Sequence, residues 1–341
     1  GLDVAFPLAD IDDFLPGMIE GRSRVYYPLG KDDHFDARVM DWVKMIRSKV
    51  RSGAHPPGEF VALEHLLHDL RLYKSANEIK IMAKAGQISA EAHCRAMKRA
   101  RKGGFEYNLE AELIHTFMEH GARSTAYPSI VGGGANGCIL HYIENDAILR
   151  EGEMVLVDAG CEYRYYASDI TRTWPVSGKF SPAQRDLYDA VLALQQELID
   201  ACAASPTFEE VSRLTTTRSV EILKDLGVLE GDTEEIIASG AHKRYAPHGF
   251  GHWLGIDVHD TAPYHDAHGS VRLSPGHVLT IEPGIYIPLD SEHVPVELRG
   301  QGVRIEDDVL ITSQGVEILT AACPKAPDTI ESIVGSAPTS L

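Results

Sequence analysis

Hydrophobic residues recur along this chain with two different spacings, which predict helices in some segments and strands in others. Residues 35–50 place Val39, Val43 and Ile46 on one face of an amphipathic helix. Residues 25–27 form a short apolar run that is typical of a strand. No catalytic pattern appears before residue 70, so we expect a separate N-terminal segment to end there.

Capping boxes mark the start of three longer helices. In each box, Ser or Thr is followed three residues later by Glu or Gln, whose side chain can bond back to the backbone of the first residue. The three pairs are Ser75 with Glu78, Ser181 with Gln184, and Thr207 with Glu210. We expect these helices to end near residues 103, 204 and 227. A further helix is expected with Asn108 as its N-cap and Gly121 just past its end.

Strands are predicted in two other regions, residues 127–176 and 249–318. Residues 155–157 form a fully apolar run, and a hairpin after them would bring Asp158 and Asp169 side by side. Each strand region follows a pair of predicted helices. Two such rounds predict an α+β domain with an internal pseudo-two-fold duplication.

Composition and charge narrow the classes of function. A length of 341 residues is enough for two domains. The net charge of −18 argues against nucleic acid and against an anionic membrane surface as partners. No apolar stretch is long enough to cross a bilayer. The 5 cysteines are odd in number and include no C-x-x-C pair, so we expect a reducing compartment, the cytoplasm.

Four carboxylates stand at the ends of apolar strand segments, where an unpaired charge is costly to bury. Asp158 follows one such segment, and Asp169 would lie across the hairpin from it, adding like-charge repulsion. Glu282 and Glu306 follow two later apolar segments, and His252 is the natural nitrogen ligand. A shared cation removes these penalties. The set has room for two divalent metal ions, which can polarise a carbonyl and hold a hydroxide that attacks an amide.

Several other polar residues have competing explanations. His248 and His252 have the spacing of a zinc-binding helix, but the two glycines between them disfavour a helix, so we expect both side chains to face one cavity with different roles. Seen alone, His141 fits a buried histidine bonded to backbone, and Arg304 fits a strand ion pair with Asp307. The glycine-rich residues 132–137 lack the Lys of a phosphate-binding loop, and we expect a flexible rim of the cleft. Loop or surface positions are expected for His265, His268, His277 and His293.

The five predicted ligands resemble those of the pita-bread metallopeptidases. The supporting stretches are residues 130–142, 158–163, 169–173, 248–260 and 303–308, and the resemblance runs from about residue 72 to the C-terminus. Within this family, the chain is most similar to the proline-specific branch, Xaa-Pro aminopeptidase (aminopeptidase P). The resemblance implies a pita-bread (creatinase/aminopeptidase) catalytic domain over residues 71–341. It also implies that residues 1–70 are the remnant of an N-terminal creatinase-like α/β domain whose first half is missing.

The resemblance also implies a role for each ligand. Asp158 would chelate one metal ion with both oxygens. Asp169 and Glu306 would bridge two metal ions, and His252 and Glu282 would complete the second. Manganese is the metal that the resemblance implies, and the oxygen-rich ligand set agrees with a hard ion; zinc and cobalt are alternatives.

Other residues receive catalytic and substrate-binding roles from the same resemblance. Glu282 would also accept and pass on a proton, and His259 would donate to the substrate carbonyl or its oxyanion. His248 should lie near the proline after the scissile bond, and His141 should orient the leaving side. Arg304 would anchor the bridging carboxylates.

The function implied is removal of the N-terminal residue that precedes proline, from peptides with proline at the second position. Prolidase, which is restricted to dipeptides, is the alternative. Methionine aminopeptidase fits less well, because the N-terminal segment and residues 253–259 fit the proline-specific branch better. A non-peptidase member of the fold and a scaffold protein fit less well, because all five ligand positions are filled. A homo-oligomer, a dimer or a tetramer, is expected by resemblance.

Overall fold

The computed structural model describes residues 3–337 apart from the side chain of residue 65. The chain divides between Leu70 and Arg71 into two compact units. Within the described residues, no helix is both long and apolar enough to cross a membrane.

The smaller unit combines helices with two parallel strands, β1 (Arg24–Tyr27) and β2 (Glu59–Ala62). Its helices are α1 (Ile11–Ile19), α2 (Asp33–Ser48) and the start of α3 (Glu64–Leu72). Val39 and Trp42 of α2 are buried against Tyr27 of β1. The amphipathic helix predicted over residues 35–50 is therefore confirmed as α2.

The larger unit begins with helices that follow the predicted capping boxes. All three boxes form, at Ser75, Ser181 and Thr207. The helices of this unit are α4 (Ala76–Arg99), α5 (Glu106–Glu119), α6 (Pro182–Cys202), α7 (Phe208–Asp225), α8 (Thr233–Ser239) and α9 (Pro327–Ile333). Short 3₁₀ helices are η1 (Leu8–Asp10) and η2 (Val50–Ser52) in the smaller unit, and η3 (Gly134–Cys138), η4 (Ala241–Arg244) and η5 (Val296–Leu298) in the larger.

The predicted start of α5 is wrong by several residues. Phe105 is the N-cap, and Asn108 lies inside the first turn, where its side chain accepts a hydrogen bond from Phe105 N at 2.9 Å. Asn108 thus caps the helix from the third helical position and is not itself the N-cap residue. Gly121 adopts a left-handed φ of 85° just past the helix, as its position predicts.

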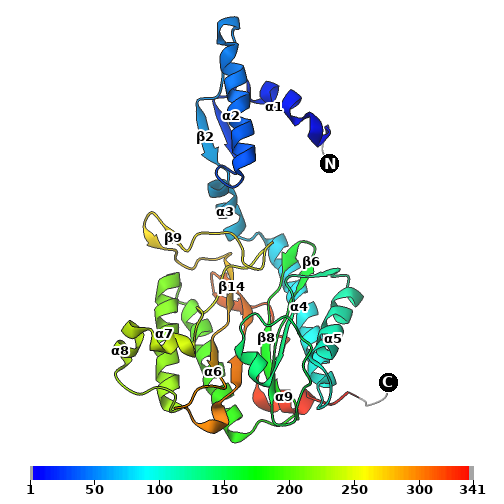
Figure 1. Cartoon of the computed structure of the whole chain (residues 1–341), viewed down its shortest axis with the longest axis vertical. Helices are drawn as coiled ribbons and strands as arrows, with labels where there is room; N and C mark the ends of the chain where they lie inside the picture. The colour runs from blue at the N-terminus through cyan, green and yellow to red at the C-terminus, as the bar shows by residue number, and fades with distance from the viewer. Residues whose placement is uncertain (1–2, 338–341) are drawn as a thin grey trace. The chain divides into compact units, whose positions relative to one another are not determined.

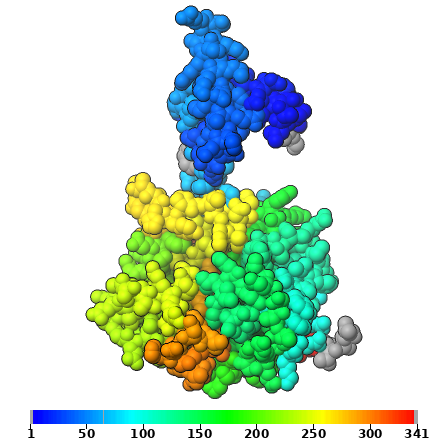
Figure 2. All heavy atoms as spheres, viewed as in Figure 1, coloured from blue at the N-terminus to red at the C-terminus, as the bar shows by residue number. Residues whose placement is uncertain are grey.

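The strands of the larger unit form small antiparallel sheets. Two three-stranded sheets lie at the centre of the unit. The first consists of β4 (Ile130–Gly133), β5 (Met154–Asp158) and β8 (Thr171–Pro175). The second consists of β11 (Val278–Ile281), β14 (Asp307–Thr312) and β15 (Gly315–Ile318). The remaining pairings are β12 (Gly284–Ile287) with β13 (Gln301–Arg304), β3 (Ser124–Thr125) with β6 (Cys161–Tyr163) and β7 (Tyr166–Ala167), and β9 (His265–Asp266) with β10 (Gly269–Ser270). Figure 2 shows the segment around β9 and β10, in yellow, at the surface of this unit.

The larger unit contains two similar halves. In the first, α4 packs on α5 and the chain then forms β4, β5 and β8; in the second, α6 packs on α7 before β11 and β14. Figure 1 shows the two helix pairs on opposite sides of the unit, with strands between them. The counterpart of β4 in the second half is residues 250–254, which bond along β11 through Thr280 N to His252 O at 2.9 Å.

A buried ion pair joins the two halves beneath their strands. Arg172 of β8 donates to Asp307 of β14 at 2.7 Å, and both side chains are fully enclosed. Lys325 also donates to Asp307, at 2.7 Å. Burial disfavours the charge of Asp307, but these two cations hold the pKa of its carboxyl below its usual value. The strands that follow Asp169 and Glu306, β8 and β14, are thereby held together.

Candidate metal centre

The four predicted carboxylates occupy matching places in the two halves. Asp158 is the last residue of β5, and Glu282 directly follows β11. Asp169 comes just before β8, and Glu306 just before β14. Because β5 pairs with β8 and β11 pairs with β14, each half delivers two carboxylates to the same end of its sheet. The duplication thus creates an acidic site from four similar strand ends.

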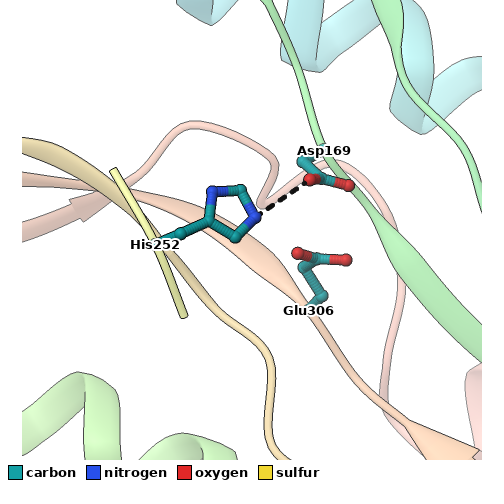
Figure 3. A group of neighbouring side chains, drawn as sticks. All are labelled: Asp169, His252 and Glu306. Atoms are coloured by element: carbon teal, nitrogen blue, oxygen red, sulfur yellow. Dashed lines mark ion pairs between the residues drawn. The ribbon is translucent and has the colours of Figure 1, made fainter. Parts of the chain in front are cut away.

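His252 faces this acidic cluster. Its Nε2 lies 3.5 Å from Asp169 Oδ2 and 3.6 Å from Glu282 Oε1. Ligand atoms of Asp169, His252 and Glu306 all lie within 4.8 Å of one another, and Figure 3 shows the three side chains pointing toward one another from separate segments. His252 Nδ1 lies 3.0 Å from Trp253 O, which fixes the proton on Nδ1 and leaves Nε2 directed at the carboxylates.

The cluster lines a cavity of about 450 Å³. All nine residues that the sequence singled out are in its wall: His141, Asp158, Asp169, His248, His252, His259, Glu282, Arg304 and Glu306. The rest of the lining is mostly apolar: Tyr127, Pro128, Ile130, Leu140, Ile143 and Val258. One chamber therefore combines a potential metal centre with an apolar surface for a substrate.

Asp158 is held from two sides. Tyr127 Oη donates to Asp158 Oδ1 at 2.6 Å and also donates to Asp169. Arg304 Nη2 donates to Asp158 Oδ2 at 2.6 Å. Tyr127 was not predicted, because it lies far from both aspartates in sequence and no local pattern marks it.

Arg304 differs from one of its two expectations. It pairs with Asp158 and not with Asp307, so the explanation as an ion pair with Asp307 is wrong. It does not bond directly to the carboxylate of Glu306 either. Its Nε donates to Thr171 Oγ1 at 3.1 Å, and Thr171 Oγ1 donates to Glu306 Oε2 at 2.6 Å. Arg304 therefore orients one carboxylate directly and a second through a hydroxyl.

A relay of hydrogen bonds fixes His248. Arg304 Nη1 donates to Tyr286 Oη at 2.6 Å, and this hydroxyl lies 2.7 Å from His248 Nε2. His248 Nδ1 lies 2.9 Å from Gly249 O, which places the proton on Nδ1. Burial and the nearby guanidinium of Arg304 lower the pKa of His248 to about 4. His248 is therefore neutral at pH 7 and accepts from Tyr286.

His259 and His141 occupy other parts of the wall. The ring of His259 meets the ring of His252 edge to face, with centroids 4.3 Å apart. Partial burial, with some help from His252, lowers the pKa of His259. His141 lies in a segment that follows η3 and has no regular secondary structure.

The buried carboxylates of the cluster repel one another, and a bound cation would reduce this repulsion. Burial, and then Asp158, raises the pKa of Asp169, while burial and three neighbouring carboxylates raise the pKa of Glu306 well above its usual value. Burial raises the pKa of Glu282 to about 7. Burial opposes a charge on His252, but Asp169 and Glu282 raise its pKa to about 9. Among the described cavity residues, Arg304 compensates part of this negative charge beside Asp158, and a proton taken up by the candidate nitrogen ligand compensates another part.

This donor set fits divalent metal ions. Four carboxylates and one imidazole supply hard oxygen donors and one nitrogen around a single cavity. Metal ions there would replace the proton on His252 Nε2 and neutralise the carboxylates without further rearrangement of charge. Hydrogen bonds outside the ligand set orient three of these side chains: Asp158 accepts from Arg304, Glu306 accepts from Thr171, and His252 Nδ1 bonds to Trp253 O.

Comparison with known proteins gives the family. The model of metallopeptidase family M24 matches residues 80–313, which include all nine cavity residues named above. The chain belongs to metallopeptidase family M24. A relative from Escherichia coli (strain K12), named Xaa-Pro aminopeptidase, is 44% identical over 337 residues, which is 99% of this chain and 76% of the relative. Another, from Haemophilus influenzae and of the same name, is 46% identical over 79% of this chain and 62% of its own length.

Solved structures agree with this placement. The aminopeptidase PepP of Pseudomonas aeruginosa has 52% identity and a TM-score of 0.92, covering 98% of this chain and 75% of that one. The predicted resemblance to the proline-specific branch and the predicted pita-bread α+β fold are therefore confirmed. This M24 peptidase spans three fifths to three quarters of the length of these relatives.

Proposed function

We propose that this M24 peptidase is a metal-dependent Xaa-Pro aminopeptidase, which hydrolyses the bond between the N-terminal residue and a following proline. The observation that carries the proposal is the convergence of four carboxylates and His252 in one cavity that also holds three further histidines. The names of the relatives support the proline specificity.

The ligand assignments belong to this proposal. Asp158, Asp169, His252, Glu282 and Glu306 would hold two divalent metal ions, with Asp169 and Glu306 shared between them. Bound there, the pair would polarise the scissile carbonyl and supply a hydroxide nucleophile. The His252 ring contributes through Nε2, because its Nδ1 is engaged with Trp253 O. Manganese is the metal proposed, supported by the oxygen-rich donor set, with zinc and cobalt as alternatives.

Other residues would bind substrate and move protons. Glu282 would accept the proton of the attacking water and pass it toward the amide nitrogen; this role is supported by burial, which raises the pKa of Glu282 to about 7. His259 would donate to the oxyanion and His248 would contact the proline, both as neutral imidazoles because their pKa values are lowered. His141 would orient the leaving side, and Arg304 would keep Asp158 in place.

The charge of the cavity favours peptides longer than a dipeptide. A dipeptide carries its free carboxylate next to the scissile bond and needs a cation nearby. Among the described cavity residues there is no lysine, and Arg304 is already engaged by Asp158, Tyr286 and Thr171. A dipeptide carboxylate would therefore find no free lysine or arginine among the described residues of the cavity wall, which disfavours the prolidase alternative.

Other predictions extend beyond the site. We propose a homo-oligomer, a dimer or a tetramer, and a location in the cytoplasm, supported by five cysteines that are all free. Residues 1–70 are proposed as part of a creatinase-like α/β domain, supported by their parallel strand pair and flanking helices. Peptides are proposed as the partners, and nucleic acid and membranes are not, in keeping with the net charge of −18.

The test is hydrolysis by the metal-stripped protein with and without added Mn²⁺. We expect metal-dependent cleavage of a Xaa-Pro-Xaa tripeptide, with little cleavage of a Xaa-Pro dipeptide and of a Xaa-Ala-Xaa control. Asp169→Asn should abolish turnover, because the amide cannot carry the negative charge that a shared ligand needs. Full activity of Asp169→Asn would contradict the two-metal site, and cleavage of the dipeptide alone would make the protein a prolidase.

A further inference from the structure

A fully buried carboxylate outside the metal cluster joins both ends of one cavity segment. Glu106 is the first residue of α5, and its exposed fraction is 0%. Its Oε1 accepts hydrogen bonds from Gly133 N at 2.7 Å and from Asn136 Nδ2 at 3.0 Å. Its Oε2 accepts from Tyr142 Oη at 2.8 Å and from Ala147 N at 2.9 Å. Both oxygens are thus fully satisfied.

Hydrogen-bond donors take the place of a cation around this carboxylate. No lysine, arginine or histidine forms an ion pair with Glu106 among the residues that the structure describes. Four donors and the N-terminus of α5 stabilise the negative charge instead. Burying a carboxylate costs free energy unless all of its hydrogen bonds form. The four donors are therefore held firmly in position around Glu106.

The four donors lie on either side of His141. Gly133 and Asn136 precede it, and Tyr142 and Ala147 follow it. Between η3 and Ala147 the chain has no helix or strand to fix its course. Yet Leu140, His141 and Ile143, the immediate neighbours of Tyr142, form part of the cavity wall.

Tyr142 transmits the constraint to this wall. Its ring is buried against Ile130, Leu156 and Tyr286, so its position is set from two directions, by packing and by Glu106. Burial, together with Glu106, raises the pKa of Tyr142, which keeps its hydroxyl protonated as a donor.

We propose that Glu106 is a positioning residue of the active site, which holds His141 and its neighbours in the substrate-binding position by binding both ends of their segment. Glu106 does not reach the cavity itself and contacts neither metal ligands nor substrate. Its effect on substrate turnover passes through Tyr142 to His141. The expected effect on catalysis depends on the proposed aminopeptidase function, whereas the effect on the segment does not.

The test removes one hydrogen bond and leaves the packing in place. Tyr142→Phe deletes the hydroxyl that donates to Glu106. Tyr166→Phe is the matched control, because Tyr166 Oη donates to another glutamate at a helix start, Glu78, at 2.9 Å, outside the cavity lining. With the Mn²⁺-loaded protein of residues 1–341 and the Xaa-Pro-Xaa tripeptide, we expect kcat/KM to fall about tenfold in Tyr142→Phe and little in Tyr166→Phe. The bound metal per chain should be unchanged in both.

Two further measurements separate positioning from a general loss of structure. In a His141→Ala background, Tyr142→Phe should cause little further loss, because both changes act on the same contact. Amide hydrogen exchange should accelerate in residues 133–147 of Tyr142→Phe, and more strongly in Glu106→Gln. In Glu106→Gln, an NH₂ group replaces one carboxylate oxygen and faces two hydrogen-bond donors that it cannot accept from. This exchange comparison needs no turnover.

The outcomes distinguish the two proposals. If exchange in residues 133–147 accelerates in the variants as expected but the wild type cleaves no tripeptide, the aminopeptidase function is overturned and the constraint on residues 133–147 stands. Equal kcat/KM for Tyr142→Phe and Tyr166→Phe would overturn the positioning role of Glu106. Unchanged exchange in residues 133–147, or a full additional loss in the His141→Ala background, would overturn it as well.

Discussion

Single histidines in this protein differ sharply according to what surrounds their two nitrogens. His248 and His252 each bond to backbone through Nδ1, but Nε2 of His248 accepts from Tyr286, whereas Nε2 of His252 faces the carboxylates. His277 was predicted at a loop or surface position; it does lie in a loop, but its exposed fraction is 0%. It lies at the turn before β11, with its ring edge-on to Trp253 and its Nδ1 accepting from Ser274 N at 3.3 Å. The turn around Ser274 was readable in the sequence, but the packing of Trp253 over it was not.

His277 should make the protein less stable in mild acid. Burial lowers its pKa to about 4, whereas an unfolded histidine titrates near 6.5. Between these values the unfolded state binds more protons than the folded state, so stability falls as pH drops from 6.5 toward 4. From pH 7 to pH 5 this one group should lower the free energy of unfolding by about 2 kcal/mol. Urea unfolding at both pH values measures this.

The matching variant is His277→Asn, whose side-chain oxygen can still accept from Ser274 N. Its free energy of unfolding should depend less on pH in this interval than that of the wild type. His265→Asn, at an exposed position, serves as the control and should keep the wild-type dependence. An identical pH dependence in His277→Asn and the wild type would show that this histidine is not the group responsible.

At the scale of elements, close backbone contacts place the ligand-bearing segments. A Cβ built on Gly251 would lie 1.9 Å from Thr280 O on β11, whereas one on Gly249 would meet nothing within 4 Å. Both glycines stand in the same short segment as His252, and neither has a left-handed φ. Only Gly251 is therefore needed for the approach of this segment to β11.

Alanine at these two glycines should have opposite outcomes. Gly251→Ala forces residues 250–254 away from β11 and should lower the free energy of unfolding by about 3 kcal/mol or more. It should also weaken metal binding, because His252 and Glu282 lie on the two separated segments. Gly249→Ala should be tolerated. Thermal unfolding and metal content of both variants test this, and equal behaviour of the two would contradict it.

Much of this arrangement could be predicted from sequence, and the part that could not has a physical reason. The capping boxes at Ser75, Ser181 and Thr207 are local, so the helices they begin were predicted correctly. The acidic strand ends could be suspected because burying a carboxylate is costly. Tyr127 and Glu106 could not, because their partners lie far along the chain and become neighbours only when the sheets form.

Residues 132–137 illustrate the same limit. Their glycines suggested a flexible rim, but they form the end of β4 and then η3, and Gly132 is packed against Asn136 so closely that a Cβ would lie 2.8 Å from its carbonyl carbon. Glycine here serves tight packing and not mobility. Composition alone does not distinguish the two uses.

At the scale of the whole molecule, the metal centre depends on both halves of the larger unit and on no described residue of the smaller. Asp158 and Asp169 come from the first half, and His252, Glu282 and Glu306 from the second. In the absence of metal, the raised pKa values of Asp169, Glu282 and Glu306 reflect charges that disfavour this assembly. Metal ions should therefore stabilise the docking of the halves and leave residues 1–70 unaffected.

Calorimetry with and without Mn²⁺ should reveal this difference. A ligand at 100 times its Kd that binds only the folded state adds about 2.7 kcal/mol to the free energy of unfolding. We expect Mn²⁺ to raise the unfolding temperature of the larger unit and to leave any separate transition of residues 1–70 in place. Asp169→Asn should reduce the shift, because it removes a ligand from the first half while the fold remains. Equal shifts of all transitions would mean that the two units unfold as one, and no shift in the wild type would mean that the carboxylates do not hold metal.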